Sequence, residues 1–169
     1  TGGMLTVYKF GPIGDSPDMS PFVIKLETWL RMANIPYATE LGGRGKKPLG
    51  KLPTVLVDDK LIADSGFIIK YLEHKFGDPL GEERLGREDK TMREAMKALF
   101  ETSLYWVGFC IRWGINENFE HYKPAMRNYA LQTSSRIEGV LLKLIEPIAF
   151  SVVRKQSLRQ AQAQGTGRH

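Results

Sequence analysis

The first part of the chain alternates short apolar runs with amphipathic stretches, a pattern that predicts strands and helices in turn. Residues 5–10 are rich in β-branched and aromatic side chains and stop at a Gly-Pro pair, which predicts a strand that runs into a loop. Residues 20–33 place apolar side chains at helical spacing, with Ser20 suited to the N-cap and Pro21 to the first helical position. A second strand is expected over 37–41. The polar residues expected outside the apolar face of the helix are Lys25, Glu27 and Arg31.

The next segment predicts a hairpin followed by another helix. Residues 54–57 and 60–63 are short apolar runs separated by two aspartates, which predicts two strands joined by a tight turn. Asp64 and Ser65 are suited to begin a helix, and Gly77 is suited to end it. The predicted order is therefore strand–helix–strand, a loop, and then strand–strand–helix.

The remainder of the chain predicts helices alone. Residues 88–113 carry apolar side chains at helical spacing and predict one long helix. Pro124 is expected to begin another helix, and a third is expected to pass Pro147 and run toward Gln164. Before the long helix, the glycine and proline residues between 78 and 87 indicate a linker. The predicted domains are an α/β domain over 4–77, a linker over 78–87 and a helical domain over 88–169.

Composition is that of an ordinary globular protein and excludes several classes. Of the 169 residues, 42% are hydrophobic and 25% are charged. A net charge of +5 does not indicate nucleic-acid binding without a clustered patch, but it favours an anionic ligand. Cys110 is the single cysteine, so no intrachain disulfide is possible and a cytoplasmic location is expected. We expect Cys110 to be a buried, inert thiol.

Neither a metal site nor a membrane span is expected from the sequence. The three histidines are scattered and have no cysteine partners at zinc-binding spacing. The most apolar segment, residues 139–153, is interrupted by two charged residues and a proline. It is also shorter than the roughly 20 apolar residues that span a bilayer. A buried helix is the favoured interpretation, and an interfacial amphipathic helix followed by basic residues is the alternative.

The strongest candidate site is a proline turn followed by an acidic helix start. Pro53 opens a strand, a position where its missing N–H is tolerated. If the Leu52–Pro53 bond is cis, the backbone of Leu52 turns outward and offers its N–H and C=O to a peptide ligand. Asp64 and Ser65 lie at a helix N-terminus, which favours a carboxylate. The combination favours a ligand site over a plain strand and a capped helix.

These motifs resemble a known family. The stretch from Tyr8 to Phe76 resembles the N-terminal domain of glutathione transferases in its element order, its Leu-Pro turn and the Asp-Ser pair that follows. The Ser-Pro-Phe-Val segment that begins at Ser20 resembles the Cys-Pro-x-Cys segment of glutaredoxins and cysteine-type transferases. Residues 47–54 and 164–169 are similar to the branch that includes the failed axon connections proteins and, more distantly, the metaxins.

The resemblance implies a thioredoxin-like α/β domain followed by an all-α domain, with glutathione as co-substrate and a homodimer as the assembly. It also implies a group at the start of the first helix that stabilises the glutathione thiolate. Ser20 occupies that position, and the alternative is that Ser20 only caps the helix. Tyr8 is the runner-up donor, unless it is a core residue, and Ser16 is a weaker third candidate. A serine cannot form the mixed disulfide of a glutaredoxin.

For glutathione binding, the resemblance implies contacts from three regions. Lys47 (or Lys46) would reach the glycine carboxylate, although it could equally be a solvated charge in a glycine-rich loop. Phe22 would pack beside the ligand, although its helical register suits the core as well. The residues implied to hold the cysteinyl backbone and the γ-glutamyl end are Leu52, Pro53, Asp64 and Ser65.

A hydrophobic electrophile would lie against the aromatic residues of the long helix, although such a stripe is more often part of a core. The aromatic residues assigned to this second-substrate pocket are Tyr105, Trp106 and Phe109. Complete transferases of this kind continue beyond the matched segment, so we expect a truncated helical domain with exposed apolar faces.

The implied activity is conjugation of the glutathione thiolate to electrophilic small molecules, as in detoxification. The alternative is a non-catalytic, metaxin-like interaction module that associates with a partner protein or with the mitochondrial outer membrane.

Overall fold

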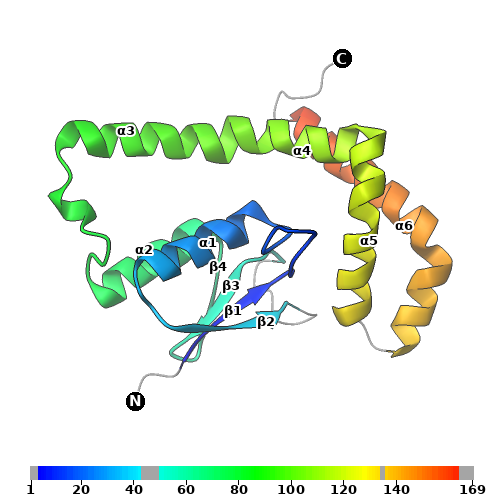
Figure 1. Cartoon of the computed structure of the whole chain (residues 1–169), viewed down its shortest axis with the longest axis horizontal. Helices are drawn as coiled ribbons and strands as arrows, with labels where there is room; N and C mark the ends of the chain where they lie inside the picture. Colours follow the sequence, from blue (N-terminus) through cyan, green and yellow to red (C-terminus); the bar gives the residue numbers. More distant parts are fainter. Residues whose placement is uncertain (1–3, 43–49, 134–135, 164–169) are drawn as a thin grey trace. The chain divides into compact units, whose positions relative to one another are not determined.

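The structure is a computed structural model that describes residues 4–42, 50–133 and 136–163. The chain divides into two compact units, Thr1–Arg84 and Leu85–His169 (Figure 1). Each unit has its own architecture: a four-stranded sheet with two α-helices and a short 3₁₀ helix, η1 (Glu82–Arg84), in the first, and helices in the second. Among the described residues, no strand follows the first unit.

The first unit is built on a mixed sheet in the order β2-β1-β3-β4. The central strand β1 pairs in parallel with β2 and antiparallel with β3, so that Val7 lies between Thr39 and Val55. β3 and β4 form the predicted hairpin. The strands are β1 (Leu5–Lys9), β2 (Tyr37–Leu41), β3 (Thr54–Val57) and β4 (Lys60–Ala63).

Two helices, α1 (Pro21–Met32) and α2 (Ser65–Phe76), contact each other beside the sheet (Figure 1). Their apolar faces meet the side chains of the central strands in a single core. The fully buried members of this core include Leu26 and Leu30 from α1, Ile68 and Leu72 from α2, and Val7 and Val55 from the sheet. This arrangement confirms the predicted thioredoxin-like domain. The predicted face of α1 is wrong at one position, because Glu27 is 4% exposed rather than on the solvent side.

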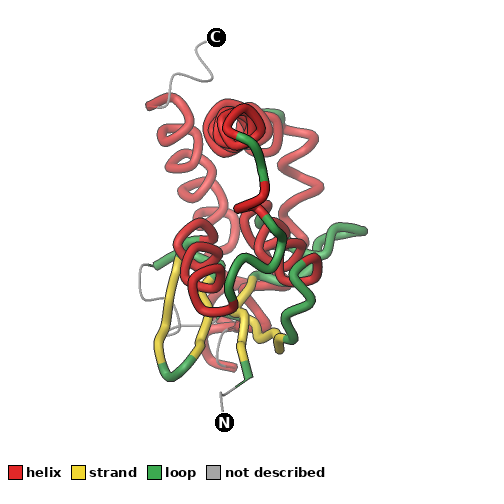
Figure 2. Tube along the Cα trace, turned by 90° about the vertical axis from the view of Figure 1, so that its left-hand side faces the viewer, coloured by secondary structure: helices red, strands yellow, loops and turns green. Residues whose placement is uncertain are grey.

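The second unit begins with a long helical rod. α3 (Arg87–Ala98) continues through a π-helical segment, η2 (Leu99–Leu104), into α4 (Tyr105–Gly114). Figure 2 looks along this rod, and its turns superimpose, so the axis is continuous. The single helix predicted over 88–113 is therefore confirmed, with a local widening that the hydrophobic pattern does not reveal.

Two further helices complete the described part of this unit: α5 (Asn116–Thr133) and α6 (Arg136–Ala163). The prediction that Pro124 begins a helix is wrong, because α5 starts eight residues earlier and Pro124 lies inside it. The start is set by Ile115, whose extended backbone ends α4 and whose carbonyl accepts the N–H of Phe119 at 3.0 Å. The prediction that the last helix passes Pro147 is confirmed. No helix among the described residues combines the length and apolarity needed to cross a bilayer.

The second unit leaves much apolar surface exposed among its described side chains. Only Phe119 and Ala161 of these side chains are buried apolar groups. Many of the exposed ones follow the long rod at helical spacing, namely Met92, Met96, Leu99, Phe100, Leu104, Val107 and Ile111, and others, including Ile148, Val152 and Val153, lie on α6. Cys110 is partly exposed, so the expectation of a buried thiol is wrong.

Candidate functional site

The start of α1 presents Ser20 at the N-cap position. Its backbone is extended (φ −101°, ψ 124°), and its carbonyl accepts the N–H groups of Val23 and Ile24, both at 3.1 Å. Its hydroxyl, however, makes no capping hydrogen bond. A serine kept only as a cap would use that oxygen to accept a backbone N–H of the first turn. The cap-only interpretation of Ser20 therefore loses its main support.

The first turn of α1 carries the positive end of the helix dipole. The turn itself contains no acidic residue, and Pro21 occupies the first position, but the carboxylate of Asp18 accepts the N–H of Ser20 at 2.8 Å just ahead of it. Phe22 is partly buried, which is compatible with either role considered for it. A negatively charged group placed near Ser20 would therefore meet the favourable end of the helix dipole.

The loop that leads into α1 is held by a buried carboxylate, Asp18, which is 1% exposed. Its two oxygens accept the N–H of Gly11 at 2.7 Å and the N–H of Ser20 at 2.8 Å. The ammonium of Lys9 lies 3.9 Å from the same side chain. Burial raises the pKa of Asp18, while the two backbone donors and Lys9 act in the opposite direction.

Lys9 in turn binds Glu27 of α1, with Nζ and Oε2 2.7 Å apart. The three side chains are 13%, 0% and 5% exposed for Lys9, Asp18 and Glu27, so the cluster is largely shielded from solvent. It joins the end of β1, the loop and α1 at a single point. Sequence reasoning missed this cluster. A lysine ending an otherwise apolar strand was the one available signal.

Within the same loop, the hydroxyl and the backbone of Ser16 both take part in local hydrogen bonds. Its hydroxyl donates to the carbonyl of Asp18 at 2.9 Å, and its backbone forms a two-bond bridge with Ile13. The N–H of Met19 donates to the carbonyl of Gly11 at 3.0 Å, which closes the loop. These bonds give Ser16 a structural role, so it is a poorer candidate than Ser20 for contact with a ligand.

The proline turn adopts the geometry on which the sequence argument depended. The Leu52–Pro53 peptide bond is cis. The carbonyl of Pro53 accepts the N–H of Asp64 at 3.3 Å, so the turn and the start of α2 are directly connected. Gly42 lies against the other side of the turn, because a Cβ there would approach the Leu52 side chain to 2.6 Å. The N–H of Gly42 also donates to the carbonyl of Lys9 at 2.7 Å.

The start of α2 carries a strained backbone. Asp64 has φ 75° and ψ 122°, which is rare for a residue with a side chain and costs about 1–3 kcal/mol. Its Oδ1 accepts the N–H of Gly66 at 2.9 Å, so Asp64 caps the helix as predicted. Ser65 is 4% exposed, whereas Asp64 is exposed. Such outliers gather at binding sites, where surrounding structure holds them.

These pieces lie around the carboxyl end of β1. Lys9 and the loop from Gly11 lead to Ser20, while Gly42 connects the same strand end to Leu52. Ligands of open α/β sheets commonly bind at the carboxyl ends of parallel strands. Tyr8, the runner-up donor, is 5% exposed within β1, a burial that favours the core role. Lys46 and Lys47 lie outside the described residues.

The aromatic residues of α4 form a cluster of their own in the second unit. The ring centroids of Tyr105, Trp106 and Phe109 lie 5.0–5.8 Å apart, in edge-on or tilted arrangements. The three side chains are partly buried, and burial raises the pKa of Tyr105. The cluster continues to Trp113, 5.6 Å from Phe109. The structure thus gathers the three residues predicted for the second-substrate pocket into one aromatic cluster.

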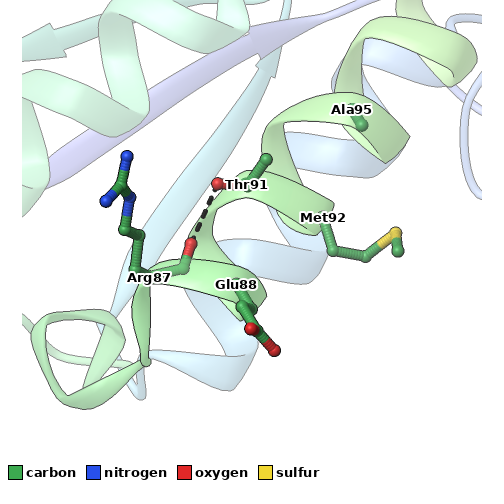
Figure 3. A pocket seen from close by; sticks show the side chains of 5 residues that line it. All are labelled: Arg87, Glu88, Thr91, Met92 and Ala95. Atoms are coloured by element: carbon green, nitrogen blue, oxygen red, sulfur yellow. Dashed lines mark hydrogen bonds between the residues drawn. The ribbon is translucent and has the colours of Figure 1, made fainter.

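A hollow on α3 contains none of the predicted site residues. Its lining comes from successive turns of one helix, and the hydroxyl of Thr91 donates to the carbonyl of Arg87 at 2.9 Å (Figure 3). The lining residues are Arg87, Glu88, Thr91, Met92 and Ala95. This combination provides no obvious nucleophile, and we assign no chemistry to it. Among the described residues, no group of histidine, cysteine or acidic side chains is arranged to hold a metal ion.

Comparison with known proteins links this architecture to one family. A family profile described as a glutathione S-transferase N-terminal domain matches residues 21–119. The isoprene-epoxide–glutathione S-transferase of Rhodococcus sp. (strain AD45) is 34% identical over 127 residues, covering 72% of this chain and 53% of that protein. The failed axon connections protein of Drosophila melanogaster is 30% identical over 170 residues, covering 98% of this chain and 39% of that protein.

The chain thus spans about half, or less, of the length of these two relatives. The family profile nevertheless covers more than half of the chain, from α1 into α5. Together with the mixed sheet and the helices that follow it, this match shows that the chain belongs to the glutathione S-transferase superfamily, in the branch that includes the failed axon connections protein.

Proposed function

We propose that this protein binds glutathione and transfers its thiolate to a small hydrophobic electrophile. The observation that carries the proposal is the state of Ser20: its hydroxyl makes no capping bond at a helix N-terminus that has no acidic residue in its first turn. A hydroxyl donor and the positive end of a helix both favour a thiolate over a thiol. They would lower the pKa of a bound thiol from its ordinary value of about 8.5.

The remaining contacts would come from the proline turn and the start of α2. Leu52 would offer its backbone to the cysteinyl residue of the ligand, as an added strand does at a sheet edge. Asp64 is exposed and would face the α-ammonium of the γ-glutamyl group, while the first N–H groups of α2 favour its carboxylate. Phe22 and Lys47 (or Lys46) would complete the site as the family pattern implies. In this proposal, residues 4–77 are the glutathione-binding domain, 78–87 a linker and 88–169 the helical domain.

The reaction would be a nucleophilic displacement or addition. The sulfur forms a new C–S bond, and the leaving group or ring oxygen takes the electron pair of the bond that breaks, followed by a proton from solvent. The name of the Rhodococcus relative specifies an epoxide, which is a small apolar electrophile. We propose the same class of substrate here, with Tyr105, Trp106 and Phe109 supplying apolar contact. A cytoplasmic homodimer with a role in detoxification completes the proposal by family analogy.

A non-catalytic interaction module is the second candidate. Two observations favour it: no cysteine occupies the start of α1, and the rod of the second unit exposes apolar side chains at helical spacing. The match to the failed axon connections protein over 98% of this chain is compatible with either function. The site, rather than the fold, separates the two candidates.

Glutathione binding by titration calorimetry tests the first candidate. We expect the wild type to bind and Asp64→Asn, which keeps the cap but removes the charge, to weaken binding by about tenfold. The matched control is Asp59→Asn in the exposed hairpin turn, which should leave the affinity unchanged. A wild type that does not bind glutathione would eliminate the enzyme in favour of the interaction module.

Conjugation kinetics test the role of Ser20. We expect Ser20→Ala to retain glutathione binding but to lower kcat/KM with 1-chloro-2,4-dinitrobenzene by on the order of 10²-fold, because the thiolate loses a hydrogen-bond donor. Ser151→Ala, on the exposed side of α6, is the control. Unchanged kinetics for Ser20→Ala would remove Ser20 from the mechanism while leaving the binding proposal intact.

A further inference from the structure

Three elements of the first unit meet at one buried carboxylate. Asp18 accepts N–H groups from both ends of its loop, Gly11 at 2.7 Å and Ser20 at 2.8 Å. Lys9, at the end of β1, lies 3.9 Å from Asp18 and 2.7 Å from Glu27 on α1. The strand end, the loop and the helix are therefore connected through a single cluster of three ionisable side chains.

The charge of the cluster argues against a purely stabilising role. Two carboxylates share one ammonium, and all three side chains are at most 13% exposed. Removing charged groups from water is unfavourable, and apolar replacements of such clusters are often neutral or stabilising. A cluster of this kind is therefore weak evidence for stability. The hydrogen bonds that the cluster makes say more about its role than its charge does.

These hydrogen bonds hold the loop between residues 11 and 20. Gly11 begins the segment with φ 108°, a conformation that suits glycine. The hydroxyl of Ser16 donates to the carbonyl of Asp18, and the N–H of Met19 donates to the carbonyl of Gly11. Asp18 then fixes the N–H of Ser20 itself, one residue before the helix begins. The backbone of Ser20 is extended, and its hydroxyl makes no capping hydrogen bond.

We infer that Asp18 is the positioning residue for Ser20, with Lys9 balancing the charge of Asp18 and Glu27 anchoring Lys9 to α1. Asp18 holds the N–H of Ser20 so that the group at position 20 lies in the field of the helix N-terminus. The consequence for a bound thiol rests on the function proposed above. The positioning itself does not, because it concerns only residues of this chain.

A cysteine introduced at position 20 provides a probe that needs no ligand. In a Ser20→Cys, Cys110→Ala background, the pKa of the introduced thiol is measured from the pH dependence of its alkylation by iodoacetamide. Asp18→Asn and Asp18→Ala are then compared in this background. Both remove the same negative charge, but asparagine keeps one acceptor oxygen in place and alanine keeps none.

The two variants separate positioning from electrostatics. A role through charge alone predicts equal thiol pKa values for the asparagine and alanine variants. Positioning predicts that the pKa is higher by about one unit in the alanine variant, so that alkylation at neutral pH is roughly tenfold slower. Equal pKa values would overturn the inference, as would a lower value for alanine.

A second pair of variants protects the test against misfolding. Lys9→Met leaves the two carboxylates without their shared cation, so that one of them takes up a proton and accepts hydrogen bonds less well. We expect the pKa of the thiol introduced at position 20 to rise. The Ser20 amide, followed in the unmodified sequence, should lose at least tenfold of its hydrogen-exchange protection. Lys70→Met on the exposed face of α2 is the matched control and should change neither value. Unchanged amide protection at Ser20 in Lys9→Met would contradict the inference.

Glutathione measurements distinguish this inference from the proposed function. If the wild type does not bind glutathione, the proposed function fails, and the pKa of the thiol introduced at position 20 still decides whether Asp18 positions that residue. If glutathione binds and Ser20→Ala impairs conjugation, we expect Asp18→Ala to lower kcat more than it raises KM. A change in KM alone would show that Asp18 supports binding only, and would overturn the inferred effect of Asp18 on the glutathione thiolate.

Discussion

In the first unit, Leu26, Leu30, Ile68 and Leu72 are enclosed completely between two helices and a sheet. In the second unit, the described side chains bury Phe119 and Ala161 but leave a row of methionine, leucine and phenylalanine exposed along the rod. Both units are folded from amphipathic elements, yet only the first closes a core within the described residues. The comparison shows that a helix with an apolar stripe does not by itself define a core. A facing element must cover the stripe.

In the second unit, polar and aromatic contacts connect the helices. Arg154 of α6 donates to the carbonyls of Trp113 and Gly114 and to the side chain of Asn116, each at 2.7 Å. Its guanidinium also lies over the ring of Phe119, 4.8 Å from the centroid. These contacts hold the end of α4 and the start of α5 against α6. The two units should therefore respond differently to loss of an apolar group and to loss of a polar one.

The largest effect is expected from Leu30→Ala in the first unit. Leu30 is 0% exposed, and truncating a buried leucine costs about 2–5 kcal/mol through lost transfer energy and the cavity left behind. Denaturant unfolding followed by tryptophan fluorescence measures the change. Met32→Ala, on the same helix but 67% exposed, is the control and should change the free energy of unfolding little. A cost below about 1 kcal/mol for Leu30→Ala would mean that the core can collapse around the site.

A smaller, local effect is expected from Arg154→Met in the second unit. The change removes the hydrogen bonds to both carbonyls and to Asn116 while keeping much of the side-chain length. We expect a loss of about 1–3 kcal/mol from α5 and α6, with no change in the first unit. Hydrogen exchange resolved by segment measures both. Lys155→Met, an exposed neighbour on the same helix, should alter neither segment. Equal deprotection of both units would show that they unfold together.

The smallest effect is expected from Phe100→Gln on the exposed face of the rod. Phe100 is 61% exposed, and substitutions at such positions change stability by about 0.5 kcal/mol or less. Thermal unfolding beside Leu30→Ala as a positive control measures the difference. A cost of several kcal/mol would break the comparison, because it would mean that another surface covers Phe100 in solution.

Local sequence signals predicted the first unit well because its boundaries depend on neighbouring residues. Pro21 begins α1, Asp64 caps α2, and the aspartate pair turns the hairpin, all as expected. The Asp18 cluster could not be found in this way. Lys9 and Glu27 are 18 residues apart in the sequence, and only the fold brings them together. The same limit explains why the sequence predicts Glu27 on the solvent side: its helical position alone does not reveal a buried cation.

The sequence predicts the backbone features of the candidate site but not the hydrogen bonding of its side chains. The Leu52–Pro53 turn and the Asp64 helix start follow from proline and capping chemistry. Whether the Ser20 hydroxyl caps α1 depends on side-chain geometry that no sequence pattern specifies. Pro124 gave a wrong helix start because a proline suits the first turn of a helix better than its interior. The extended backbone at Ile115 had already fixed the start of α5.

The π-helical segment Leu99–Leu104 sets an angular offset along the rod. A π turn spans one residue more than an α turn, so each side chain that follows it is rotated backward relative to an unbroken α-helix. In an α-helix one residue corresponds to about 100° of rotation. Deleting a single residue from this segment would restore regular winding and leave Tyr105, Trp106 and Phe109 facing the same way relative to Met92 and Met96, whereas regular α winding with every residue kept would turn them by about that angle. The π turn thus absorbs one extra residue without changing the direction in which α4 presents its aromatic side.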